Sequence, residues 1–448
     1  EPPAIMATLS LIFRPEPILF VLWANELVRL VWSPPALQTA AGWLMIAFVV
    51  LSLPHIRRGT LFLCIPLAVL AAGLAVYFDQ LAGARRGFEN AAVFMAFFGS
   101  IVLLRALADR RPEITRARNL FSSLSTEQSN GAFLVGAHVI GSILVVGVMA
   151  ILAPILKQDA NARTRRRAAE VSQRGMCLAP LWSPFWIASA FATQQLPDVP
   201  TWEIMSLGLV MAAIGMVLAH FMYARDVGLS DLWRAILGFA PIVPTVALCA
   251  ALIAGLSTVA SLSTLKALIA TIPFLAVLSL IPASRATLRA VAKEPWRSSS
   301  RVSDEIVVVT AALVLGRVLQ AAIGETGIGE TIAALAIPTW GVIACVIFIM
   351  TLTSLVGIHQ LVSMIVVLVV FVPLNTGVND TILMEAALIG WAFASMIGLT
   401  AVSTATASAM FGVPRIQLIF GPNLAFAMAF GALSVLLLSL VNSLFFAA

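Results

Sequence analysis

Apolar residues form long blocks along this chain, and short polar segments separate the blocks. Four of the blocks are about as long as the ~20 residues that a helix needs to cross ~30 Å of hydrocarbon: 37–54, 60–78, 235–256 and 423–445. No polar segment between the blocks is long enough to form a separate soluble domain. The pattern therefore predicts an all-α polytopic membrane protein that consists of one membrane domain.

Two of the apolar segments resemble each other closely. LVGAHVIGSILVV at 134–146 and LVGIHQLVSMIVV at 355–367 agree at seven of thirteen positions. The agreement includes two histidines, although the chain has only four. Two weaker matches, one upstream and one downstream, follow the same order in both halves. We interpret these matches as an internal repeat rather than as a result of shared membrane composition.

The repeat divides the chain into four parts. We expect N-terminal helices outside the repeats at 1–88, a first repeat at 89–223, linking helices with a basic loop at 224–305, and a second repeat at 306–448.

Loop charge predicts that the two repeats have opposite orientations. Arginine and lysine gather at 109–119, 157–174 and 285–301, and basic loops stay on the cytoplasmic side of an inner membrane. The corresponding flanks in the second repeat, 324–330 and 375–380, contain neither residue and should be periplasmic. Repeats that run in opposite directions are the architecture of many secondary transporters.

Each repeat contains a segment whose two ends are predicted on the same side, at 119–156 and 331–373. Each segment is long enough for two helical arms, which could form a full helical pair or a re-entrant hairpin. Polar sequence with glycine or hydroxyl residues lies within both segments, and unwound backbone at membrane depth survives only inside protein or beside water. We therefore favour re-entrant hairpins.

The composition of the chain argues against several classes of function. Hydrophobic residues make up 60% of the chain and charged residues 11%, and the net charge of +6 follows from the basic loops rather than from a nucleic-acid site. The four cysteines have no metal-ligand spacing, and no nucleotide-binding or hydrolase motif is present. We expect neither an enzyme nor a resident cofactor.

The order of helix, hairpin, serine- and threonine-rich broken helix, and helix in each half resembles the ion transporter superfamily. That group includes the divalent anion/sodium symporters, the arsenite-antiporter-like carriers and the large membrane subunits of TRAP transporters. The resemblance implies that hairpin tips and broken helices hold substrate and coupling ions. It also implies that the domain carrying them moves as an elevator.

The paired histidines are the first candidates for a substrate site. His138 and Ser142 share a helix face, as do His359 and Ser363, and Gly136 and Gly357 precede them. Helix N-termini at a tip suit an anion, and imidazole can also take up a proton. The alternative is that each histidine only braces its hairpin. With the tips and the second broken helix, the predicted substrate-binding residues are Gly136, His138, Ser142, Gly357, His359, Ser363, Asn130, Thr353, Ser354, Ser403 and Thr404.

Coupling ions are expected at the same places, with H+ or Na+ as the ion. The predicted ion-coupling residues are Ser129, Ser183, Pro184, Thr400 and Thr406. Pro184 interrupts an apolar run, which frees backbone carbonyls that can bind a cation.

These features predict a secondary active transporter that moves a small anionic solute across the bacterial inner membrane. A homodimer is considered as well. One alternative is a membrane subunit to which a periplasmic binding protein delivers substrate. Another is a membrane enzyme that acts on lipid substrates.

Overall fold

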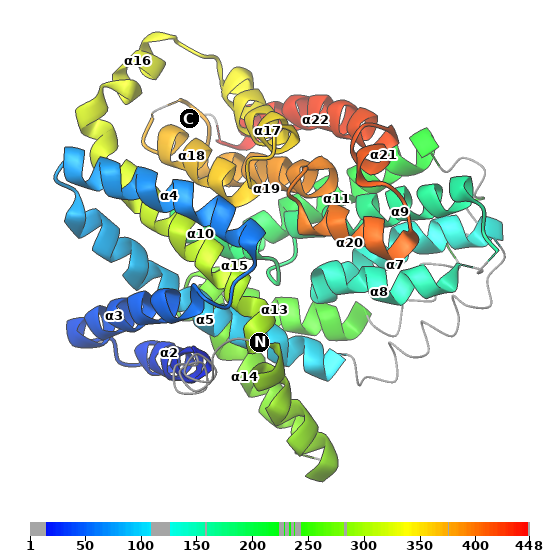
Figure 1. Cartoon of the computed structure of the whole chain (residues 1–448). Helices are drawn as coiled ribbons and strands as arrows, with labels where there is room; N and C mark the ends of the chain where they lie inside the picture. Colours follow the sequence, from blue (N-terminus) through cyan, green and yellow to red (C-terminus); the bar gives the residue numbers. More distant parts are fainter. Residues whose placement is uncertain are drawn as a thin grey trace. The chain divides into compact units, whose positions relative to one another are not determined.

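A computed structural model describes residues 15–108, 126–156, 159–223, 228, 233, 237, 243–281, 285–374 and 376–446 (Figure 1). All regular elements within these ranges are helical. Eight of the described helical segments are long and apolar enough to cross a membrane. The predicted all-α polytopic fold is therefore confirmed.

The chain forms two compact units. The first contains residues 1–107 and 269–331, and the second contains residues 108–268 and 332–448. The helices of the first unit are α2 (Glu16–Arg29), α3 (Pro35–Ser52), α4 (Arg58–Tyr77), α5 (Leu81–Ala108) and α15 (Arg285–Thr326). The three boundaries along the chain fall at the end of α5, within α14 (Thr264–Leu280) and within α16 (Ile328–Ala334).

Close helix packing holds the first unit together. α4 packs along α15, and α2 packs on α3. A Cβ on Gly87 would lie 2.5 Å from Val314 Cα, so α5 and α15 touch through backbone at this glycine. Small residues allow such close approach between membrane helices. At the start of α4, Arg57 forms a 2.7 Å ion pair with Asp304 on α15.

The second unit contains the remainder of both predicted repeats. From the first repeat it takes α7 (Thr126–Leu144), η1 (Val145–Gly147), α8 (Val148–Leu152), η2 (Ala153–Ile155), α9 (Ala162–Cys177), η3 (Ala179–Leu181), α10 (Ile187–Gln195) and α11 (Thr201–Tyr223). From the second it takes α17 (Thr339–Leu355), α18 (Gln360–Phe371), α19 (Asp380–Ile397), α20 (Val402–Phe411), α21 (Arg415–Ile419), α22 (Pro422–Val441) and η4 (Asn442–Phe446). α13 (Val243–Val259) lies between them in the chain.

Both repeats contain a hairpin followed by a broken helix. α17 and α19 run in the same direction, because Met350 contacts Gly390 and Ser354 contacts Gly398 and Leu399. α18 must therefore return the chain between them, and its 12 residues span only ~18 Å, too short to cross a bilayer. α7 and α9 are likewise parallel, with α8 folded back on α7. The second hairpin turns where its polar sequence predicted, whereas the first turns at 145–147, because the polar residues 126–131 that we expected at its tip form the start of α7.

The broken helices of the two repeats run in opposite directions. Arg167, near the start of α9, donates to Tyr223 O at the end of α11 at 3.1 Å. Thr381, at the start of α19, donates to Glu203 Oε2 at the start of α11 at 3.0 Å. Since α9 and α19 begin at opposite ends of the same helix, the repeats are inverted.

Two basic segments that we predicted as loops are helical instead. Residues 285–301 form the first part of α15, and most of 157–174 forms α9, whose second half is buried. Charge density alone suggested a loop, but Asn161 caps α9 by accepting from Thr164 N at 2.9 Å, and alanines follow the arginines. The third basic segment, 109–119, lies outside the described residues. The predicted repeat starts at 89 and 306 lie inside α5 and α15.

Candidate functional site

The tip of the second hairpin lies against the break in the second broken helix, which we call the second break (398–401). The amide of Leu399 donates to Ser354 O at 3.1 Å, and a Cβ on Gly357 would lie 3.9 Å from Thr400 Cγ2. α18 begins at this tip and α20 begins at this break. Two helix N-termini with unpaired N–H groups therefore lie close together, an arrangement that suits an anionic group.

His359 caps one of these N-termini. Its Nδ1 accepts from Leu361 N at 3.2 Å, which assigns the N–H of the neutral ring to Nε2. The residue is partly exposed, and Gly357 before it has the positive φ of +90° that the tip requires. The structure thus places Gly357 and His359 where the sequence predicted them, at a tip and at the start of an arm.

His138 lies elsewhere, within α7 and away from the tip. Its Nδ1 faces Gly175 O at 3.0 Å, and its Nε2 accepts from Trp182 Nε1 at 3.1 Å. Both ring nitrogens are occupied, which is the geometry of a brace between α7 and the end of α9. The prediction that Gly136 and His138 begin an arm is wrong, because the first tip is formed by Val145 and the two residues after it.

The first tip lies against the first break (178–186). Ser183 Oγ donates to Ser142 O at 2.5 Å, and Trp186 Nε1 donates to Gly141 O at 3.1 Å. α9 ends before Pro184 and α10 begins after it, as the sequence predicted. Ser189 Oγ donates to Ser183 O at 2.7 Å, so this freed carbonyl has a partner. Ion coupling at Ser183 and Pro184 stays a prediction.

The predicted hydroxyls of the second hairpin bond within the hairpin. Thr353 Oγ1 and Ser363 Oγ lie 2.7 Å apart and join the two arms, while Ser354 Oγ donates to Thr351 O at 2.7 Å. Gly136 and Ser142 are buried within α7. The side chains of Ser129 and Asn130 lie outside the described residues, although their backbone belongs to α7.

The predicted hydroxyls around the second break differ in exposure. Ser403 and Thr404 are buried in α20 and donate back to Ser395 O, which the break leaves without its helical partner. Thr400 is exposed within the break, and Thr406 is half-buried on α20. Thr400 is therefore the most exposed of these four residues.

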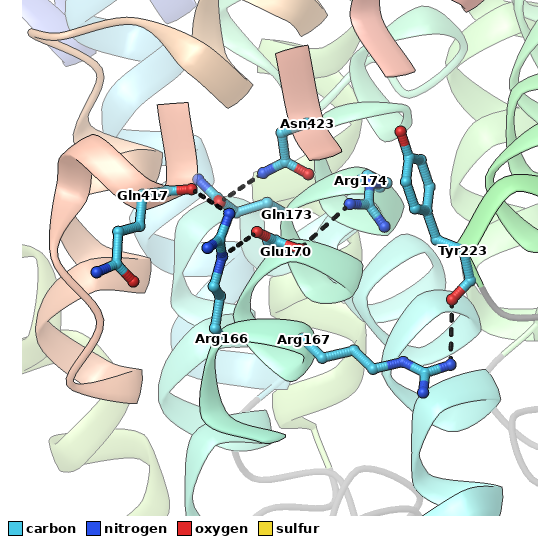
Figure 2. Close-up of polar contacts among 8 residues, drawn as sticks. All are labelled: Arg166, Arg167, Glu170, Gln173, Arg174, Tyr223, Gln417 and Asn423. Carbon is cyan, nitrogen blue, oxygen red and sulfur yellow. Dashed lines mark hydrogen bonds and ion pairs between the residues drawn. The ribbon is translucent and has the colours of Figure 1, made fainter. Parts of the chain in front are cut away.

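A charged cluster on α9 was missed by sequence reasoning (Figure 2). Glu170 lies between Arg166, at 2.8 Å, and Arg174, at 3.6 Å. The Arg174 guanidinium also lies 4.0 Å from the centre of the Tyr223 ring. The sequence does contain a sign of this cluster, because 166, 170 and 174 follow the four-residue spacing of one helix face. The density of arginine in this segment favoured a loop instead.

Arg174 remains charged despite its burial. Its guanidinium lies 3.6 Å from the Glu170 carboxylate and 4.0 Å from the centre of the Tyr223 ring, and these two groups balance its charge.

Gln173 connects this cluster to the second break. Its Nε2 lies 3.4 Å from both Met396 O and Thr404 Oγ1, and its Oε1 accepts from Asn423 Nδ2 at 3.0 Å (Figure 2). Arg166 also donates to Gln417 O at 3.2 Å. The first half of one broken helix is thus tied to the break of the other.

A second buried glutamate lies on α19. Glu385 is 0% exposed, and neither carboxylate oxygen has a hydrogen-bond partner in the described part of the chain. From sequence alone we would expect this glutamate near a helix end and in contact with water, but five residues of α19 precede it and its neighbours in the helix are buried.

Comparison with solved structures finds proteins of similar fold. The chain matches a structure described as "Crystal structure of the Alcanivorax borkumensis YdaH transporter reveals an unusual topology", with a TM-score of 0.51 and 14% sequence identity. The match covers 87% of this chain and 98% of that one. No protein-family model and no curated protein sequence matches the chain. The likeness establishes a shared polytopic fold over nearly the whole chain.

Proposed function

We propose that this chain is a secondary active transporter that moves a small anionic solute across the bacterial inner membrane by an elevator-type mechanism, driven by H+ or Na+. The observation that carries the proposal is how the two compact units divide the repeats. The first unit takes α5 and α15, the first helix of each repeat, and the second takes both hairpins and both broken helices. A unit that contains both half-sites can move as one body against a fixed one.

The likeness in fold to the YdaH transporter supports the same proposal, because the match covers 87% of this chain. Binding sites in such inverted repeats lie at discontinuous helices, whose ends supply unpaired backbone groups. The tip–break contacts in this chain have that character in both repeats.

An anionic substrate follows from the second tip. The N-termini of α18 and α20 provide backbone donors and the positive ends of two helix dipoles. His359 Nε2–H and the Thr400 hydroxyl stand beside them as additional donors. A carboxylate or an inorganic oxyanion matches this set of donors.

Uptake into proteoliposomes tests the proposal. The purified protein is reconstituted, an H+ or Na+ gradient is imposed, and accumulation of labelled carboxylates and inorganic oxyanions is measured. We expect gradient-dependent accumulation of at least one anion, with weaker apparent affinity in His359→Ala. A substitution remote from both tips, Gly73→Ala on α4, is the control, because no atom lies within 4 Å of the added methyl group. An absence of flux for every anion would refute the proposal, and flux only with an added periplasmic extract would favour delivery by a binding protein.

A further inference from the structure

Glu385 differs from the other buried glutamates in this chain for which contacts are described. Glu26, Glu89 and Glu170 each have an arginine within 3.3 Å. Glu385 is fully buried within α19 and has neither a donor nor a cation among the described residues. An ionised carboxylate is strongly disfavoured in such a place, whereas the protonated acid carries no charge.

The helices that pack on α19 supply no counter-charge at this depth. α10, α18, α20, α22 and η3 carry no titratable side chain. The titratable groups on the other helices in contact with α19 are Glu203, His220 and Tyr223 on α11, Cys345 on α17, Arg415 on α21, and the arginines, Glu170 and Cys177 on α9.

Most of these groups lie toward the other end of α19. The α9 cluster contacts the end of α11, whereas Glu385 is four residues from Thr381, which contacts the start of α11. Cys345 lies at about the same level along α17 as Glu385 does along α19. It is not on the fully buried face of α17, which Val342, Ile343 and Val346 form. Glu203 and Asp380, which lies in the first turn of α19, are therefore the acidic groups at the end of α19 where Glu385 is found.

Glu203 and Thr381 connect Glu385 to the end of the helix. Thr381 and Glu385 are separated by one helical turn and share a face of α19. Thr381 Oγ1 donates to Glu203 Oε2 at 3.0 Å, and Glu203 is partly exposed. A titratable group in water, a hydroxyl and a buried carboxyl thus follow one another inward from the end where α11 and α19 begin.

We propose that Glu385 binds the coupling proton of transport and that Glu203 and Thr381 form its route to water. One proton passes from water to Glu203 and then inward, along the face of α19 that carries Thr381, to the Glu385 carboxylate. Glu385 has no hydrogen-bond partner among the described residues, so the last transfer requires a water molecule or a side-chain movement between Thr381 and Glu385. Release of the same proton from Glu385 restores the carboxylate during the transport cycle. This inference rests on the proposed function and specifies its coupling ion. Ionisable groups retained at membrane depth commonly serve this role.

The experiment compares Glu385→Gln with wild type in the same proteoliposomes. Glutamine has the shape of the protonated acid but cannot release a proton. We expect pH-gradient-driven accumulation to fall about tenfold or more, while exchange of labelled for unlabelled substrate without a gradient persists. A pH-sensitive dye inside the vesicles should show substrate-linked proton movement in wild type and none in Glu385→Gln.

Two further variants make the outcome specific. Glu385→Asp keeps a carboxyl and should retain coupling. Glu89→Gln changes a buried glutamate of the first unit and should leave coupling unchanged within roughly twofold. Normal pH-driven accumulation in Glu385→Gln, or loss of exchange in folded Glu385→Gln, would overturn the inference, as would wild-type accumulation that follows sodium alone. An absence of all wild-type flux would refute the proposed function itself.

Discussion

The two broken helices differ in how they accommodate a buried glutamate. Each carries a buried glutamate in its first half, Glu170 on α9 and Glu385 on α19. Glu170 is held between Arg166 and Arg174, whereas Glu385 has no charged neighbour among its described contacts. Burial of a charge is tolerated when it is paired and is costly when it is not. One repeat therefore keeps a fixed charge, and the other has a group whose charge can change.

The largest expected effect on stability comes from replacing these two glutamates. Glu170→Gln leaves Arg174 buried without its carboxylate and should lower the free energy of unfolding by about 3 kcal/mol. Glu385→Gln removes no ion pair and should change it by less than about 1 kcal/mol. Denaturant unfolding in mixed micelles measures both. Equal losses would show that the two glutamates are in equivalent environments.

A second difference lies in how each hairpin meets its broken helix. A Cβ on Gly175 would meet the backbone carbonyl of Leu134. A Cβ on Gly390 would lie 2.9 Å from the flexible Met350 Sδ and 3.0 Å from Met350 Cβ, and the nearest backbone atom, Ile347 O, is 3.3 Å away. Gly175→Ala should therefore cost about 2–3 kcal/mol and Gly390→Ala about 1 kcal/mol, since backbone cannot move aside as a methionine can.

The matched control for these two is Gly255→Ala on α13, where no atom lies within 4 Å of the added methyl group. It should stabilise the protein by up to about 1 kcal/mol through helix propensity. The same unfolding measurement ranks all three variants. A larger cost at Gly390 than at Gly175 would contradict the packing described for α7 and α9.

A third comparison concerns the two histidines. His138→Ala removes the partner of Trp182 Nε1 in a buried site and should cost about 2 kcal/mol. His359→Ala removes a helix cap worth about 1 kcal/mol, and His359→Asn should restore most of it. Thermal unfolding separates the variants, and transport should be impaired more by His359→Ala than its stability loss explains. If the loss of transport in both variants is proportional to their loss of stability, neither histidine contacts the substrate.

The sequence was sufficient for the architecture but not for the register of the repeat. The helical segments, the second hairpin and the breaks follow from block length and from proline or hydroxyl residues that interrupt apolar runs, which are properties of single segments. The Leu-Val-Gly-x-His match misled, because its letters fall in the middle of α7 in one repeat and at the tip before α18 in the other. Identity between apolar segments does not specify which turn of a helix they occupy.

The site was harder to predict for a related reason. Arg166, Glu170 and Arg174 look like a solvated basic segment, and only tertiary contacts with Tyr223 and Gln417 show that the second half of α9 is buried. Gln173 and Asn423 are 250 positions apart in sequence, so their pairing is invisible to local pattern. The second tip was predictable, because glycine, histidine and the start of an apolar run mark it within a few residues.

That long separation has a consequence for biogenesis. Gln173 meets Asn423, and Arg166 meets Gln417, across 250 and 251 positions. At about 5–20 residues per second, synthesis leaves α9 without these partners for roughly 12–50 seconds. During that time its buried polar face must be covered by lipid headgroups, water or the insertion machinery. The second unit should therefore reach its native packing only after the last helix has entered the membrane, and truncation before α22 should yield a chain that quality control removes.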